Sequence, residues 1–182
     1  MQSRIFNMMQ KRGFSSLYNY SNAANPRVYM TVAQGEKKLG NLVFELYADK
    51  QPNTSENFRT ICQGEGAASY VGTGFHYGLS EFGIAGGKID DDNVGADGTR
   101  QSDEDLTLRH HKRGLLTAST DGLNASGSQF MITFGETPTL NGYQTVFGEL
   151  VEGDKVLEAL EQGVNRLGEV TEDFTITATG EK

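Results

Sequence analysis

The chain has 182 residues, of which 36% are hydrophobic and 22% are charged, so we expect one folded domain with a sizeable core. No apolar run approaches the length of a membrane-spanning helix, and a single cysteine, Cys62, excludes an internal disulfide framework and a cysteine-based zinc site. The net charge of −8 is unevenly divided, because residues 1–27 hold four of the 16 basic residues and none of the 24 acids. The acidic remainder argues against nucleic acid as a partner, since phosphate binding needs Lys and Arg.

The N-terminal residues resemble a mitochondrial presequence. Residues 1–21 lack acids and combine Arg4, Lys11 and Arg12 with serines and apolar side chains. The run from Arg12 to Ser15 resembles a matrix-processing site, which would remove residues 1–14. A retained tail held by partner subunits and a free basic tail are the alternatives. We therefore divide the chain into a basic tail, residues 1–27, and a domain, residues 28–182.

The first elements of the domain are two strands and a helix. Apolar residues alternate with other residues over 28–32 and 42–46, which predicts antiparallel strands joined by a turn at 34–37. A helix is predicted to start near Pro52, with Asn53 as its N-cap and Glu56 three residues later. Its buried stripe comprises Phe58, Ile61 and Cys62, and Gly64 and Gly66 end it.

The rest of the chain adds short strands and one more helix. The helix spans residues 154–162, with Val156, Leu157 and Leu160 on its inner face and Gly163 as its stop. Strands are expected at 74–79, 82–85, 115–119, 129–134, 145–150 and 174–179. Together these elements predict a mostly β fold, an eight-stranded antiparallel barrel capped by two α-helices.

Several segments in this order resemble the cyclophilin family of peptidyl-prolyl isomerases. The run from Leu39 to Arg59 is similar to the second strand and first helix of the family. Phe75-His76 and Gly86-Gly87, Gly127 to Phe130, Leu140 to Gly142 and Val146 to Gly148 follow at family-like spacing. The resemblance covers residues 27–180 and implies the same capped barrel, with no cofactor.

The resemblance also implies an active-site groove, and most of its residues differ here. The family places an arginine directly after the Phe-His pair, and this chain has Tyr77. Further departures are Gly83, Ala85, Ser119-Thr120, Met131, Thr139 and Gln144, whereas the residues that match are Phe82, Gln129 and Leu140. We therefore expect no catalytic residue and no useful isomerase activity, and we assign Phe82, Gln129 and Leu140 as candidate peptide-binding residues.

Three other features have simpler interpretations. The acidic run from Asp90 to Asp97 misses the calcium-loop ligand pattern and is expected to be a solvated loop. His110 and His111 would diverge on a strand, so paired metal ligation is not expected. His76 is expected to be a packed scaffold histidine. We assign no metal site.

The sequence supports one function and leaves two alternatives open. The favoured interpretation is a cyclophilin-fold accessory or structural subunit of a mitochondrial multiprotein assembly in the matrix or on the matrix side of the inner membrane. A respiratory-chain or ATP-synthase complex is preferred to the mitoribosome because the body is acidic, and the N-terminal tail is the expected contact. The alternatives are an active mitochondrial isomerase that assists folding and a non-catalytic peptide-recognition module.

Overall fold

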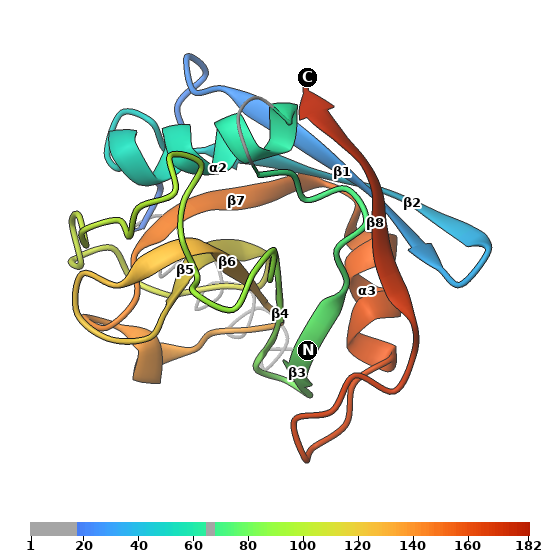
Figure 1. Cartoon of the computed structure of the whole chain (residues 1–182). Helices are drawn as coiled ribbons and strands as arrows, with labels where there is room; N and C mark the ends of the chain where they lie inside the picture. Colours follow the sequence, from blue (N-terminus) through green and yellow to red (C-terminus); the bar gives the residue numbers. More distant parts are fainter. Residues whose placement is uncertain (1–17, 65–67) are drawn as a thin grey trace, which may run out of the picture.

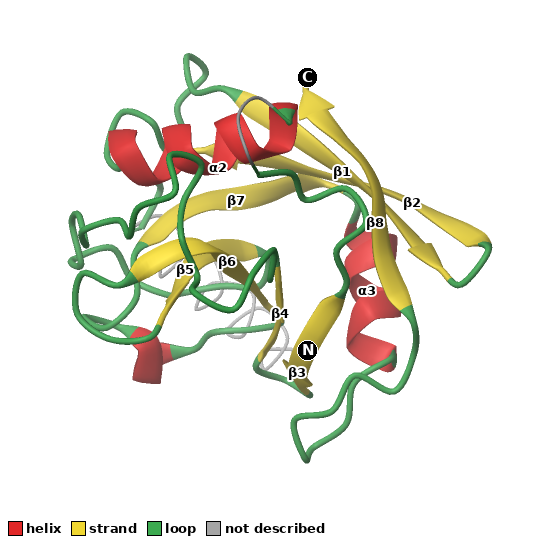
Figure 2. Ribbon diagram, viewed as in Figure 1, coloured by secondary structure: helices red, strands yellow, loops and turns green. Residues whose placement is uncertain are grey.

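The computed structural model describes residues 18–64 and 68–182, and an eight-stranded sheet forms their framework (Figures 1 and 2). The strands are β1 (Arg27–Gln34), β2 (Lys37–Leu46), β3 (Phe75–Leu79), β4 (Gly83–Gly86), β5 (Leu115–Thr120), β6 (Ser126–Thr133), β7 (Val146–Glu152) and β8 (Phe174–Glu181). The helices are α2 (Pro52–Gln63), α3 (Asp154–Gln162) and a 3-10 turn, η1 (Pro138–Leu140). Each predicted strand and helix is present, and β2 begins five residues before its predicted start at 42.

The sheet is antiparallel throughout and strongly curled. Its strand order is β3-β4-β6-β5-β7-β2-β1-β8, so β3 and β8 are the edge strands. The segment before β3 approaches the other edge, where the Gly72 N–H donates to the Ile176 carbonyl at 2.8 Å and the Ile176 N–H donates to the Thr73 carbonyl at 2.9 Å. The predicted capped antiparallel barrel is confirmed, in the form of a curled half-barrel with two helices.

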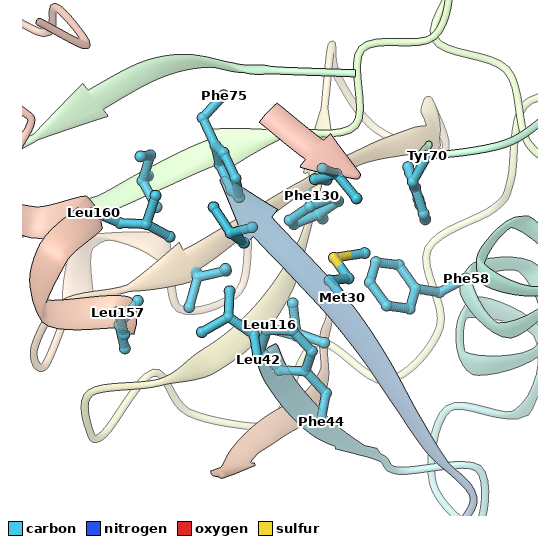
Figure 3. Packing of buried hydrophobic residues seen from close by; sticks show 14 of the residues in the cluster. Met30, Leu42, Phe44, Phe58, Tyr70, Phe75, Leu116, Phe130, Leu157 and Leu160 are labelled. Atoms are coloured by element: carbon cyan, nitrogen blue, oxygen red, sulfur yellow. The ribbon is translucent and has the colours of Figure 1, made fainter. Parts of the chain in front are cut away.

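The inside of the curled sheet holds a single large apolar core (Figure 3). On the α2 side of this core, the Phe58 ring packs against three other aromatic rings. Its centroid lies 5.1 Å from those of Tyr70 and Phe147 and 5.3 Å from that of Phe130. On the α3 side, Leu157 and Leu160 are fully buried in the same core. The two helices therefore supply the apolar side chains that the curled sheet alone leaves uncovered.

The start of α2 differs from the prediction in its capping residue. Gln51 stands at the N-cap without a side-chain capping bond, and Asn53 lies inside the first turn. The free N–H groups of Asn53 and Thr54 donate instead to the Glu104 carboxylate, at 3.1 and 2.8 Å. The predicted Asn53 cap is therefore wrong: a carboxylate from a distant loop binds the positive end of the helix. The stop at Gly64 is confirmed, with a left-handed φ of 68°, and Gly66 lies outside the described residues.

A search for membrane-crossing helices among residues 18–64 and 68–182 finds none with sufficient length and hydrophobicity.

The Glu104 cap generates a paired prediction. Glu104→Ala removes the acceptor for two helix N–H groups and for the Thr54 hydroxyl, so we expect it to lower the free energy of unfolding by about 1–2 kcal/mol. Asn53→Ala changes only an exposed side-chain contact, and we expect a loss below about 0.5 kcal/mol. Urea unfolding of both variants measures the difference. A larger loss of unfolding free energy for Asn53→Ala than for Glu104→Ala would contradict this and show that Asn53 is the capping residue.

Candidate functional site

Four strands place side chains from distant parts of the sequence in one row. Tyr77 of β3 lies opposite Ala85 of β4, Ala85 lies opposite Met131 of β6, and Met131 lies opposite Thr117 of β5. The neighbouring residues on the other side of the same strands belong to the core, among them Ile84, Leu116 and Ile132. Because side chains alternate between faces, Tyr77, Ala85, Met131 and Thr117 form what we call the outer row.

Gln144 and Leu140 stand at the Thr117 end of the outer row. The Thr117 hydroxyl lies 3.3 Å from Gln144 Oε1 and 3.2 Å from the Thr145 carbonyl, so it can donate to either. The Gln144 N–H donates to the Leu140 carbonyl at 3.2 Å, which fixes η1 beside the row. Both side chains are partly exposed. The structure thus brings Tyr77, Ala85, Met131 and Gln144 together through Thr117, a residue that the sequence analysis did not single out.

Gly83 and Met131 are in close contact. A Cβ built on Gly83 would lie 3.2 Å from both Cγ and Sδ of Met131 and 2.8 Å from the Ile132 carbonyl oxygen. The absence of a side chain at position 83 therefore leaves room for the Met131 thioether to lie against the β4 backbone. Met131 is 7% exposed and Ala85 is 4% exposed.

The Tyr77 ring lies against the loop that follows α3. A Cβ on Gly168 would come within 2.7 Å of Tyr77 Cε2, and φ at Gly168 is 91°, in the region that favours glycine. The Gly78 N–H donates to the Gly168 carbonyl at 3.4 Å. The ring is 42% exposed at this end of the outer row. Its packing partner is consequently the loop backbone.

The three candidate peptide-binding residues come from three elements. Gln129 lies on β6 two residues before Met131, so both side chains project from the same face. Leu140 ends η1, and Phe82 occupies the turn between β3 and β4, immediately before Gly83. All three are partly exposed.

His76 lies beside Gln129 at the surface. It is exposed, so the prediction of a packed scaffold histidine is wrong: Phe75 points into the core, and alternation along β3 directs the next side chain outward. Partial burial and the positive charge of Lys88 lower the pKa of His76, and a hydrogen bond with Gln129 opposes them.

His110 contacts the outer row at Thr117. It is completely buried, with Nδ1 3.0 Å from Asn141 Oδ1 and Nε2 3.1 Å from the Thr117 hydroxyl. His111 turns outward, and its ring centroid lies 5.4 Å from those of Tyr18 and Tyr20. The two histidines have separate surroundings, as predicted, although they lie in the loop before β5 and not on a strand. The role of His110 could not be read from the sequence, because both of its partners are contributed by other segments.

Asn93 is a second supporting residue that the sequence analysis missed. Most of the acidic segment around it is exposed, as predicted, but Asn93 itself is 1% exposed and has a left-handed φ of 48°. Its Oδ1 accepts the Gln129 N–H at 3.1 Å and its Nδ2 donates to the Ser119 carbonyl at 3.3 Å. The β5–β6 register shifts between Ala118 and Thr120. The Asn93 amide therefore bonds to backbone groups of both strands beside this irregularity.

A separate cavity of about 470 Å³ lies between α2 and the loop at 96–101. None of the outer-row residues lines it. The residues that line it are Asn53, Glu56, Asn57, Thr60, Ala96, Asp97 and Gln101. The Asn57 amide is already used, since it accepts the Ala96 N–H and donates to the Gly127 carbonyl. We therefore take the outer row as the candidate site.

Comparison with protein families identifies a match that covers most of the chain. The family model described as "Cyclophilin type peptidyl-prolyl cis-trans isomerase/CLD" matches residues 28–181, which is nearly the whole described structure.

The buried His110 generates a pH-dependent prediction. Burial lowers its pKa, the charge of His111 acts in the same direction, and the Asn141 hydrogen bond opposes both. In the unfolded chain it takes up a proton near its ordinary pKa of about 6.5. We therefore expect full stability above about pH 6.5 and a progressive loss as the pH falls below it.

Chemical unfolding at pH 7.5 and 5.5 measures this loss. His110→Gln should reduce the difference between the two pH values, whereas His111→Gln at the surface is the matched control and should change it less. Each variant is compared with the wild type, because His76, whose pKa is also lowered, contributes to the same loss of stability at low pH. An unchanged pH dependence in His110→Gln would contradict the prediction.

Proposed function

The chain belongs to the cyclophilin-type peptidyl-prolyl cis-trans isomerase family, and from this premise we propose that it is a non-catalytic member that serves as an accessory or structural subunit of a mitochondrial assembly. The observation that carries the proposal is the composition of the outer row, in which Tyr77 replaces the arginine that the resemblance implies and Met131 lies over Gly83.

The chemistry of proline isomerisation explains why Tyr77 matters. Rotation about the X-Pro bond has a barrier of about 18–20 kcal/mol, because the planar amide is conjugated. The twisted amide loses conjugation, so its nitrogen becomes basic and benefits from a hydrogen-bond donor. Arginine offers five N–H donors and a fixed charge, whereas tyrosine offers one neutral O–H on a shorter side chain. The contact of the Tyr77 ring with Gly168 further disfavours its use as a donor over Ala85 and Met131.

The apolar part of the outer row is altered as well. The resemblance implies a methionine at position 83 and a phenylalanine at 131 in the proline pocket, and a glutamine at 85. Here the methionine side chain is supplied from position 131 and lies against Gly83, and Ala85 has no polar group. A surface with these exchanges lacks both the donor and the aromatic wall. We infer that it does not bind the twisted amide better than the planar one, which is the requirement for catalysis.

The subunit role rests on composition. The acid-free N-terminal residues, with three bases within the first 12 positions, support import into or docking on mitochondria. The acidic body favours a protein assembly, with a respiratory-chain or ATP-synthase complex preferred and the tail as the contact. The family scaffold is kept while the site residues differ, as expected when selection acts on folding and contacts rather than on turnover.

A peptide-recognition module is the second candidate. Phe82, Gln129 and Leu140 remain partly exposed along the outer row, and Asn93 and His110 hold the surrounding backbone. These features would permit an extended segment to bind without isomerisation. The third possibility, an active isomerase, requires a donor that the outer row does not supply.

An isomerisation assay tests the loss of activity. With an Ala-Pro peptide, we expect the chain to have kcat/KM at least about 100-fold below that of an active cyclophilin measured in parallel, because a missing positioned donor typically costs that much. Tyr77→Arg alone should recover little, since Met131 still covers Gly83. The combination Tyr77→Arg, Gly83→Met, Ala85→Gln and Met131→Phe should recover more.

Circular dichroism of each variant controls for folding. Native activity within tenfold of the active cyclophilin would overturn the pseudoenzyme proposal and favour the folding-helper alternative.

Native gel migration tests the subunit role. After mild solubilisation of mitochondria, we expect the chain to migrate with a large complex and to be identified with its companions by mass spectrometry. Migration solely as a free monomer would contradict the subunit proposal. A partner peptide cross-linked to Gln129 or Leu140 would favour the recognition module.

A further inference from the structure

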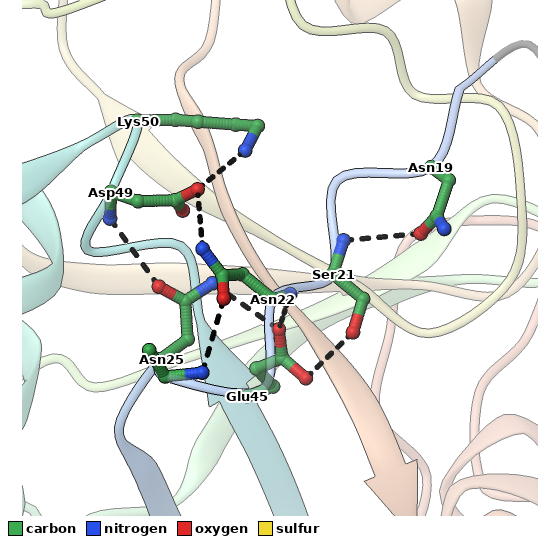
Figure 4. A network of polar contacts seen from close by, with 8 residues as sticks. Asn19, Ser21, Asn22, Asn25, Glu45, Asp49 and Lys50 are labelled. Carbon is green, nitrogen blue, oxygen red and sulfur yellow. Dashed lines mark hydrogen bonds and ion pairs between the residues drawn. The ribbon is translucent and has the colours of Figure 1, made fainter.

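Residues 18–26, which we call the strap, lie along the outside of the sheet before β1 begins. Figure 4 shows the side chains of Ser21 and Asn25 turned toward Glu45 of β2. The backbone N–H of Asn22 also faces Glu45, whereas its side chain bonds with Asp49. The sequence analysis placed these residues in the basic tail. Their contacts support a different assignment.

Glu45 is the centre of these contacts. Its carboxylate accepts hydrogen bonds from the Ser21 hydroxyl at 2.9 Å, the Asn22 N–H at 2.7 Å and the Asn25 amide at 3.2 Å. Glu45 is 1% exposed. A buried carboxylate is costly unless it is hydrogen bonded, and here the strap supplies three donors.

The position of Glu45 makes those donors more important. It lies directly opposite Glu149 of β7, which is also buried, and like charges at such positions repel. Glu149 forms an ion pair with Lys112. Within residues 18–64 and 68–182, no lysine or arginine pairs with Glu45. The hydrogen bonds from the strap therefore stabilise the negative charge of Glu45, which no cation in the described residues pairs with.

Aromatic contacts hold the other end of the strap. The Tyr20 ring packs against Tyr47, with a centroid distance of 5.7 Å, and joins a small buried cluster that also contains Leu108, Leu115 and Val146. Its hydroxyl accepts the Arg109 N–H at 3.0 Å. Asn22 and Asn25 bond with Asp49, and the Pro26 carbonyl accepts the Leu46 N–H. The strap is thus tied to β2, to the segment that follows it and to the loop before β5.

We infer that the strap is part of the folded body and that any proteolytic maturation of this chain cuts before Tyr18. The mature protein retains residues 18–26, and Tyr18, the first described residue, packs against His111. The cut predicted after Phe14 satisfies this limit, whereas removal of the whole basic region through residue 26 does not. The inference holds whichever partner the protein has and whether or not it is an isomerase.

Truncated chains test the inference by thermal unfolding. A chain that begins at Ser15 should keep the Tm of the full chain. A chain that begins at Arg27 loses the bonds to Glu45 and the Tyr20 packing, so its Tm should be lower by roughly 5–10 °C, or it should fail to fold. Equal Tm values for the two truncated chains would overturn the inference.

Substitution of Glu45 provides a test that does not depend on the shortest chain folding. In the full chain, Glu45→Gln puts an amide NH₂ against donors, so we expect a lower Tm; Glu36→Gln at the exposed β1–β2 turn is the matched control and should leave it unchanged. In the chain that begins at Arg27, if it folds, Glu45→Gln should leave Tm unchanged or raise it, because repulsion from Glu149 is removed. No effect of Glu45→Gln in the full chain would overturn the inference.

Mass spectrometry of the protein from its natural source locates the terminus directly. We expect the first residue at or before Tyr18. A mature chain whose first residue lies after Tyr18 would overturn the inference.

Discussion

The register of β3, β4, β6 and β5 determines both faces of the region on which the proposed function depends. Because the strands pair Tyr77 with Ala85, Ala85 with Met131 and Met131 with Thr117, the residues beside them, such as Ile84 and Ile132, must point into the core. The apolar face constrains the register strongly. The outer face can change its chemistry without changing the register, so a family scaffold can be kept while the site residues differ.

The contact between Gly83 and Met131 illustrates such a change. Packing requires that the volume lost at one position be filled or left as a void, and here the Met131 thioether lies against the backbone that Gly83 leaves bare. Two exchanges on neighbouring strands therefore offset each other sterically. The two exchanges still change a prolyl pocket, because the aromatic ring that the resemblance implies at position 131 is absent. Tyr77 similarly packs its ring against Gly168 but supplies no cationic donor.

Carboxylates and amides stabilise this acidic body by binding backbone groups from distant segments. Glu104 accepts the first N–H groups of α2, Glu45 accepts donors from the strap, and Asn93 bridges the backbones of β5 and β6. Each side chain joins two segments that the core does not connect at that point. The loops and the strap consequently depend on single polar residues, while the sheet depends on many apolar ones.

The sequence by itself determined the elements, because their signals are local: alternation identifies strands such as 42–46, and the stripe of Val156, Leu157 and Leu160 identifies α3. The ordered family motifs likewise located Tyr77, Ala85, Met131 and Gln144. Only the tertiary structure decided which residues cap, support or bridge them. Glu104 displaced Asn53 as the cap, and residues 18–26 joined the body, because each outcome depends on a partner contributed by another segment and no local periodicity encodes that partner.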